Sequence, residues 1–144
     1  MSDISVTAAD VRPLHPFLTA RKRCGGSVNV GDSVYINSSG YVQQTSAGTD
    51  TIGTSTCYGV VVAVNTTGGT VAASGDYCDV VIYGRVTGFS SLTANQLLWV
   101  STAAGKIAND QAGNNYYNFC VGQTEDSTTI LVRPCAENIA AQSS

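Results

Sequence analysis

Tyr58-Gly59-Val60-Val61-Val62-Ala63-Val64 is the stretch that decides the fold class. It is an unbroken apolar run in which valine dominates, and β-branched side chains favour extended backbone over helix. A short continuous apolar run bounded by turn residues is typical of a strand that is covered on both faces. Thr66-Thr67-Gly68-Gly69 follows as a turn. We therefore expect a buried strand over residues 58–64.

A hairpin is predicted on the N-terminal side of this strand. Val34-Tyr35-Ile36 leads through Asn37-Ser38-Ser39-Gly40 to Tyr41-Val42. Glycine adopts the positive φ that closes a short hairpin loop without steric penalty. The pattern therefore predicts two antiparallel strands joined by a bulge-type turn.

A strand with alternating faces is predicted on the C-terminal side. Side chains alternate across a strand, so one face carries Cys78, Val80 and Ile82, and the other Asp79, Val81, Tyr83 and Arg85. Further strands are predicted over Leu97–Ser101, Lys106–Ala108, Tyr116–Gly122 and Thr128–Arg133. A single helical turn is possible only at Ser90–Gln96. Many short strands between turns predict an all-β fold, a small barrel or a sandwich.

The predicted strands form a weak internal repeat. The hairpin over Val34–Val42 resembles Leu98–Ile107, which has one extra turn residue. Each hairpin is followed by a second strand, and each second strand by a third after an acidic turn. The order hairpin, strand, strand thus occurs twice, which implies two pseudo-equivalent halves that share one core. Common small-barrel patterning that arose by chance is the alternative.

The N-terminal region differs from the rest in charge and in proline content. Residues 1–30 carry a net charge of +2 and the remainder −5. Because proline fixes φ and disfavours helix in the preceding residue, Arg12-Pro13-Leu14-His15-Pro16-Phe17 should be extended. We interpret residues 1–27 as an extended arm laid over a surface, with Ile4–Thr7 as an edge strand; a frayed tail is the alternative. Residues 28–135 then form a single β domain, and residues 136–144 a C-terminal tail.

Composition excludes several classes of protein. Only 12% of the 144 residues are charged and the net charge is −3, which disfavours nucleic-acid binding through bulk charge. No stretch approaches 18 consecutive apolar residues, so no membrane-spanning helix is expected. The opening MSDISVTAAD has neither a basic start nor an apolar segment, which is unlike a secretory signal. We therefore expect synthesis in a reducing cytoplasm.

The cysteines and the other potentially catalytic residues do not form a recognisable catalytic or metal-binding motif. The sequence favours buried or half-buried free thiols for Cys24, Cys57, Cys78, Cys120 and Cys135, over disulfides or a metal site, because their count is odd and no C-x-x-C spacing occurs. His15 is the only histidine and has no triad partners. Glu125-Asp126 is interpreted as an exposed turn rather than a carboxylate pair. No phosphate-binding glycine motif is present. We expect no enzyme activity, no cofactor and no metal.

Three features remain as candidates for binding. Arg21-Lys22-Arg23 is either a solvated charge run or a docking site for an acidic partner. Trp99 lies among apolar residues and is interpreted as an anchor in the core or at a subunit interface. Tyr116-Tyr117 should place one ring on each face of a strand, so that one ring is buried and the other is a contact residue.

Eight strand and turn motifs follow one another along the chain: Ile4–Val11, Val30–Tyr35, Ser39–Tyr41, Tyr58–Val61, Gly75–Gly84, Asn95–Val100, Ala104–Ile107 and Ile130–Val132. In the order of these motifs the sequence resembles the phage capsid cement, or head decoration, proteins. The resemblance covers roughly residues 4–133, and it rests on the order of the motifs because each alone is a generic strand-turn signal. The five cysteines, the basic triplet and the loop at Thr45–Thr56 depart from the family pattern.

The resemblance implies a β-tulip-like fold and a structural role. The protein would form a homotrimer on the outer surface of the expanded phage head, where it would clamp neighbouring major capsid proteins. The arm is our candidate for the capsid contact, because an extended segment can pair with a sheet edge of a neighbour. Its candidate residues are Ile4, Val6, Arg12, Leu14, Phe17, Arg21, Lys22 and Arg23, and those of the subunit interface are Trp99, Tyr116 and Tyr117.

Two further expectations follow for experiments. Deletion of residues 1–23 should abolish head binding and leave a folded oligomer. The competing interpretation is a receptor- or carbohydrate-binding β module of a phage fibre or tail, which would need a solvent-facing aromatic cluster such as Tyr41, Tyr116 and Tyr117.

Overall fold

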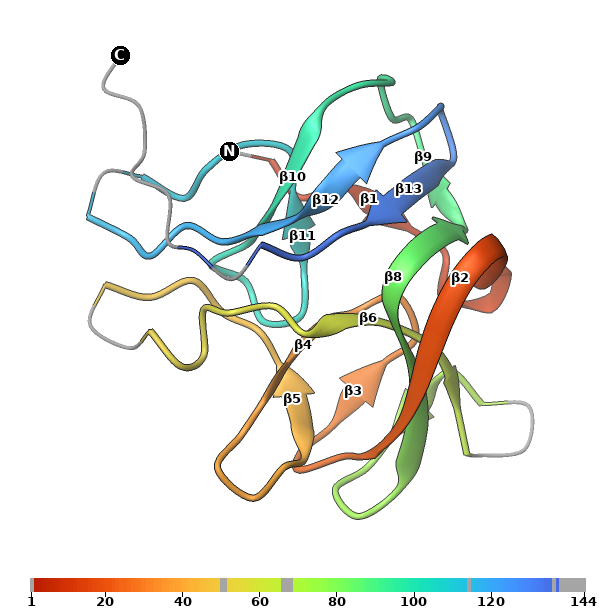
Figure 1. The fold of residues 1–144 in the computed structure, drawn as a ribbon, viewed down its shortest axis with the longest axis vertical. Coiled ribbons are helices and arrows are strands. Elements are labelled where there is room, and N and C mark those ends of the chain that lie inside the picture. The colour runs from red at the N-terminus through yellow and green to blue at the C-terminus, as the bar shows by residue number, and fades with distance from the viewer. Residues whose placement is uncertain (1, 50–51, 66–68, 114, 136, 138–144) are drawn as a thin grey trace.

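Strands make up nearly all of the regular structure in the computed structural model, which describes residues 2–49, 52–65, 69–113, 115–135 and 137 (Figure 1). The fold is all-β, as predicted, and its only helical element among these residues is the 3-10 turn Ala8–Asp10. The strands are β1 Ser5–Val6, β2 Arg12–Arg23, β3 Val28–Asn29, β4 Ser33–Ile36, β5 Val42–Gln44, β6 Gly59–Val64, β7 Val71–Ala72, β8 Tyr77–Thr87, β9 Phe89–Ser90, β10 Leu97–Val100, β11 Ile107–Ala108, β12 Cys120–Thr124 and β13 Thr129–Val132. No helix in the described residues is both long enough and apolar enough to span a bilayer.

A single curled sheet of half-barrel shape contains nine of these strands. Its order is β11-β10-β12-β13-β8-β6-β4-β5, and β2 pairs with β8 off this path. The hairpin β4–β5 is followed by β6 and β8, and the hairpin β10–β11 by β12 and β13. In Figure 1 the strands β10–β13 lie in the upper part of the molecule and β3–β6 in the lower part, while β2 and β8 run through both.

Strand β8 joins the two parts because its two ends have different neighbours. Cys78–Val81 pairs with β6, and Gly84–Thr87 pairs with β13. Strand β2 follows β8 along its whole length, from Arg12 opposite Thr87 to Arg23 opposite Tyr77. Every hydrogen-bonded connection between β6 and β13 in the curled sheet therefore passes through β8.

The predicted alternation of β8 is interrupted at Ile82. Tyr83 lies opposite Leu18 of β2 and Val81 lies opposite Thr19, so Ile82 has no partner on β2. Such an extra residue shifts the phase of the side chains, which puts Val81 on the opposite face from Tyr83 rather than on the same face. Val80 and Val81, which point to opposite faces, are both fully buried, so β8 is covered on both faces at this point.

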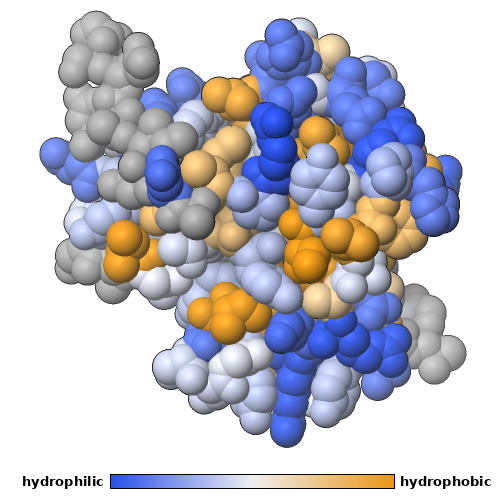
Figure 2. Space-filling model, viewed as in Figure 1, coloured by the Kyte–Doolittle hydropathy of each residue, from blue (hydrophilic) through white to orange (hydrophobic). Residues whose placement is uncertain are grey.

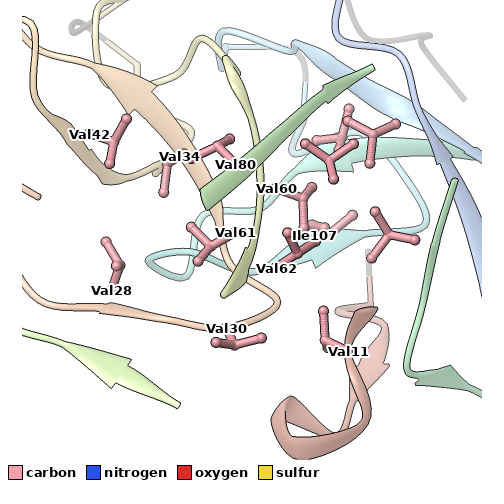
Figure 3. Close-up of a cluster of buried hydrophobic side chains, with 14 of the residues drawn as sticks. Val11, Val28, Val30, Val34, Val42, Val60, Val61, Val62, Val80 and Ile107 are labelled. Atoms are coloured by element: carbon pink, nitrogen blue, oxygen red, sulfur yellow. The ribbon is translucent and has the colours of Figure 1, made fainter. Parts of the chain in front are cut away.

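The core is built mainly from valine and is centred on β6. Val60, Val61 and Val62 are all buried, which confirms the prediction of a strand covered on both faces. Figure 3 shows Val61 on the side of Val34 and Val80, and Val60 and Val62 on the side of Ile107. The hairpin before β6 is also confirmed, with Ile36 opposite Val42 and Gly40 at a φ of 82°.

Two local predictions need correction. The helical turn considered at Ser90–Gln96 is not formed, since Ser90 belongs to β9 and Ser91 and Asn95 have positive φ. The strand predicted from Tyr116 begins only at Cys120. The buried Asn118 side chain explains why the strand starts later in the sequence. It accepts a hydrogen bond from Ala112 N and donates to the carbonyl oxygens of Gly113 and Tyr116.

The N-terminal segment packs against the remainder of the same chain. The extended conformation expected around Arg12–Phe17 is present as part of β2, and the edge strand expected at Ile4–Thr7 is present as β1, which pairs with β9. Ile4 N donates to Ile107 O at 2.8 Å, beside the outer edge of β11. Gly25 N donates to Val42 O at 2.9 Å, beside β5 at the other end of the sheet. The segment therefore caps both ends of the curled sheet. Of the predicted C-terminal tail, all but Glu137 lies outside the described residues.

Candidate binding surface

An outward-facing row of side chains crosses five strands of the upper sheet. Residues directly opposite each other in neighbouring strands point to the same face. The row consists of Leu14 on β2, Arg85 on β8, Leu131 on β13, Gln123 on β12 and Leu97 on β10. The other face of these strands is the core face, where Val86, Ile130 and Val132 are fully buried.

Two more apolar side chains enlarge this row. Leu18 of β2 lies directly opposite Tyr83 of β8, two residues along β8 from Arg85 and therefore on the same face. Leu18 is 62% exposed, Leu97 50% and Tyr83 47%. We call the set Leu14, Leu18, Tyr83, Leu97 and Leu131, together with the polar residues among them, the outer sheet face. Figure 2 shows apolar surface interspersed with hydrophilic surface over these strands.

Polar side chains on the outer sheet face are hydrogen-bonded to each other. Arg85 Nε donates to both carboxylate oxygens of Glu125 at 3.0 Å, and its Nη1 donates to His15 O at 3.0 Å. Arg133 Nη2 donates to Gln123 Oε1 at 2.9 Å. A solvated sheet face normally carries polar residues. Here the polar groups are largely occupied with each other, and the leucines between them are available to a partner.

Each cation of the predicted basic triplet has a partner within the chain. Arg21 Nε donates to Asp79 Oδ1 at 3.0 Å, and this bond raises the pKa of the guanidinium above its usual value. Lys22 Nζ lies 5.7 Å from the centroid of the Tyr58 ring, and Arg23 Cζ lies 5.3 Å from that of Tyr41. The triplet is therefore not a row of unpartnered charges, and its role in docking stays a prediction.

The other predicted contact residues differ in how far they are buried. Ile4, Val6 and Phe17 are half-buried and pack against the core, and Arg12 is exposed at the start of β2. Trp99 is only 7% exposed, so it leaves little surface for another subunit. Tyr116 and Tyr117 are both half-buried against the core rather than one buried and one exposed. Of the eleven predicted contact residues, Leu14 alone lies on the outer sheet face as defined above.

Side chains that could serve in catalysis are engaged in other contacts. His15 is exposed and its ring packs 4.8 Å from that of Phe17. Glu125 is bonded to Arg85, whereas Asp126 accepts hydrogen bonds from the Thr128 and Thr129 backbone, which lower its pKa. Within the described ranges, no three histidine, cysteine or acidic side chains lie close enough together to hold a metal ion.

Sequence reasoning did not identify Leu18, Leu97 and Leu131 as surface residues. A signal was present for Tyr83 and Arg85, which the alternation of β8 placed on one face. The row itself depends on pairings between strands that are far apart in the sequence, such as Leu14 with Arg85.

Neither the protein-family models nor the curated proteins searched include a match to this chain.

Proposed function

We propose that this protein is a structural capsid cement protein that binds the outer surface of the expanded phage head. The order of its strand motifs suggests this role, and the outer sheet face is the observation that carries it. A face that spans five strands and carries the exposed side chains of Leu18, Tyr83 and Leu97 is suited to packing against another protein. Full burial of a fully exposed leucine contributes about 1.5–3 kcal/mol, so Leu18 and Leu97, which are 62% and 50% exposed, would contribute correspondingly less.

The proposed mechanism is thermodynamic linkage. A protein that binds only the expanded lattice stabilises that lattice by RT ln(1 + [L]/Kd). We propose that the chain forms a homotrimer, because a trimer that contacts several major capsid proteins gains avidity. In this arrangement β2 contributes Leu14 and Leu18 to the capsid contact, so the N-terminal segment acts as part of a sheet rather than as a free arm.

We also propose that the chain consists of two pseudo-repeated halves. The support is the strand order, in which each hairpin is extended by two further strands: β4–β5 by β6 and β8, and β10–β11 by β12 and β13. The two halves differ in their surfaces. The outer sheet face is formed by the second half together with β2 and the C-terminal end of β8.

Co-sedimentation with purified heads tests the proposed function. The wild-type chain should pellet with empty expanded heads and stay in the supernatant with unexpanded shells. Leu18→Asp and Leu97→Asp should each lose pelleting, because a buried carboxylate opposes an apolar interface. Val71→Asp is the matched control: Val71 is also 50% exposed but lies on β7, outside the outer sheet face, so this variant should still pellet.

The competing class makes a different prediction in the same experiment. A receptor- or carbohydrate-binding module would leave the wild-type chain in the supernatant with both kinds of shell, which would overturn the cement proposal. The aromatic cluster that such a module would need gains no support from geometry. Tyr41, Tyr116 and Tyr117 are all half-buried, and Arg23 stacks on the Tyr41 ring.

A further inference from the structure

Two of the five cysteines face each other in the lower part of the molecule. Cys24 immediately follows β2 and Cys78 is the second residue of β8. Both are buried in the hydrophobic core, at 1% and 2% exposure. The two thiols lie close enough for each to influence the pKa of the other.

The backbone holds these two cysteines in register. Cys24 N donates to Asp76 O at 2.7 Å, and Gly75 N donates to Cys24 O at 2.8 Å. Lys22, two residues before Cys24, lies opposite Cys78. The two cysteines are therefore diagonal neighbours on adjacent antiparallel segments, with their side chains on the same face. A disulfide needs an S–S distance of about 2.0 Å and Cα atoms no more than about 7 Å apart, and diagonal neighbours on adjacent strands lie near that limit.

The other three cysteines have different partners. Cys57 Sγ donates to Gly59 O, Cys120 Sγ to Gly122 O and Cys135 Sγ to Glu137 O.

We propose that Cys24 and Cys78 form a disulfide bond when the protein meets an oxidising environment. The bond would close the loop that contains β3 to β7 and would fasten the end of β2 to the start of β8. It would act mainly by restricting the unfolded chain, an effect that grows with the length of the closed loop. This inference does not rest on the capsid role.

The oxidant we name is a small-molecule disulfide such as oxidised glutathione. One protein thiolate attacks it, forms a mixed disulfide and releases one reduced glutathione. The second protein thiol, once deprotonated, attacks the mixed disulfide and releases the second glutathione. The protein loses two hydrogen atoms and the oxidant gains two. Burial raises the pKa of both thiols, that of Cys78 to about 12, so the reaction should be slow at neutral pH.

The experiment uses the folded full-length chain and no variant. The protein is incubated with oxidised glutathione under native conditions, its remaining thiols are then alkylated in denaturant, and the digest is mapped by mass spectrometry. We expect a cross-linked peptide that joins Cys24 to Cys78, with Cys57, Cys120 and Cys135 alkylated. Alkylation of all five cysteines, or cross-links between other pairs in place of this one, would overturn the proposal.

Thermal unfolding provides a second measurement. The midpoint of the oxidised protein should exceed that of the reduced protein, and dithiothreitol should remove the difference. Cys78→Ala should show no such difference, whereas Cys135→Ala, the matched control, should keep it. If Cys78→Ala does not fold, peptide mapping of the wild-type chain still decides the question. If mapping shows the cross-link but the oxidised and reduced proteins unfold at the same temperature, the disulfide does not stabilise the fold.

Discussion

Asp32 is a carboxylate held almost entirely inside the protein. It is 3% exposed and accepts hydrogen bonds from Asn29 N at 2.8 Å and Gln44 Nε2 at 2.7 Å. The turn before β11 packs directly on it, since a Cβ placed on Gly105 would lie 2.7 Å from Asp32 Cγ. Desolvation therefore raises the pKa of Asp32, although both hydrogen bonds and Lys106 act in the opposite direction.

This raised pKa makes stability depend on pH. Because the folded-state pKa lies above the ordinary value of 3.8, the contribution of Asp32 is fully present below pH 3.8 and is lost as the pH rises through the folded-state pKa. Asp32→Asn removes this loss. The unfolding free energy of the variant relative to wild type should therefore rise with pH across that window, by at most about 1.4 kcal/mol per pH unit. Urea denaturation at a series of pH values measures it, and a pH-independent difference would contradict the prediction.

Two ion pairs of equal length should differ in strength because they differ in exposure. Both have N–O distances of 3.0 Å, but the side chains of Arg21 and Asp79 are 69% and 33% exposed, against 34% and 29% for Arg85 and Glu125. Double-mutant cycles with alanine should give about 0.5–1 kcal/mol for Arg85–Glu125 and a value close to experimental error for Arg21–Asp79. A stronger coupling for the exposed pair would show that exposure does not control these contacts.

At the scale of elements, the contact between β2 and β8 requires a glycine. Gly84 has a φ of 133° and lies opposite Phe17, and a Cβ there would overlap Phe17 Cα and Pro16 O. Gly84→Ala should therefore lower the unfolding free energy by roughly 2–4 kcal/mol. Gly53→Ala is the control, because no atom lies within 4 Å of its added Cβ, and it should change stability by less than about 0.5 kcal/mol. Equal midpoints in urea for the two variants would contradict this account of the contact.

Elements set by local chemistry could be predicted from the sequence. The Asn37–Gly40 turn and the valine run at Val60–Val62 carry their own signals, and both were confirmed. The start of β12 could not be predicted, because Asn118 supplies hydrogen bonds that compete with strand pairing. The sequence around Asn118 contains no pattern that indicates these bonds. The pairing of β2 with β8 was also missed, since it joins segments more than 50 residues apart.

The candidate surface shows the same limit at the scale of the whole molecule. Sequence reasoning placed binding in the N-terminal region and named Leu14, but it treated the region as separate from the β domain. The outer sheet face exists only when β2, β8, β13, β12 and β10 are assembled in register. Residues such as Leu18 and Leu97 have no sequence signal of their own, because exposed leucines are common in any protein.

Deletion of residues 1–23 should have a different outcome from the one that the sequence suggested. The deletion removes β1 and β2, so β8 loses the strand that pairs with it along its whole length and keeps only β6 and β13 on its other edge. It also removes the buried core residue Val11 and the strand β1, whose Val6 pairs with the buried Phe89. We therefore expect an unfolded or aggregated product rather than a folded oligomer that fails to bind. Circular dichroism and size-exclusion chromatography measure this, and a cooperative, folded deletion product would restore the arm interpretation.

The pairing of β2 with β8 also has a consequence for synthesis. Arg12 and Thr87 are partners, yet 74 residues separate them in the chain. At about 5–20 residues per second, β2 waits several seconds on the ribosome before its partner strand is made. During this delay its edge is open to mispairing with other nascent chains. Two prolines and the basic residues within β2 reduce that risk, because they are poor partners for a foreign strand.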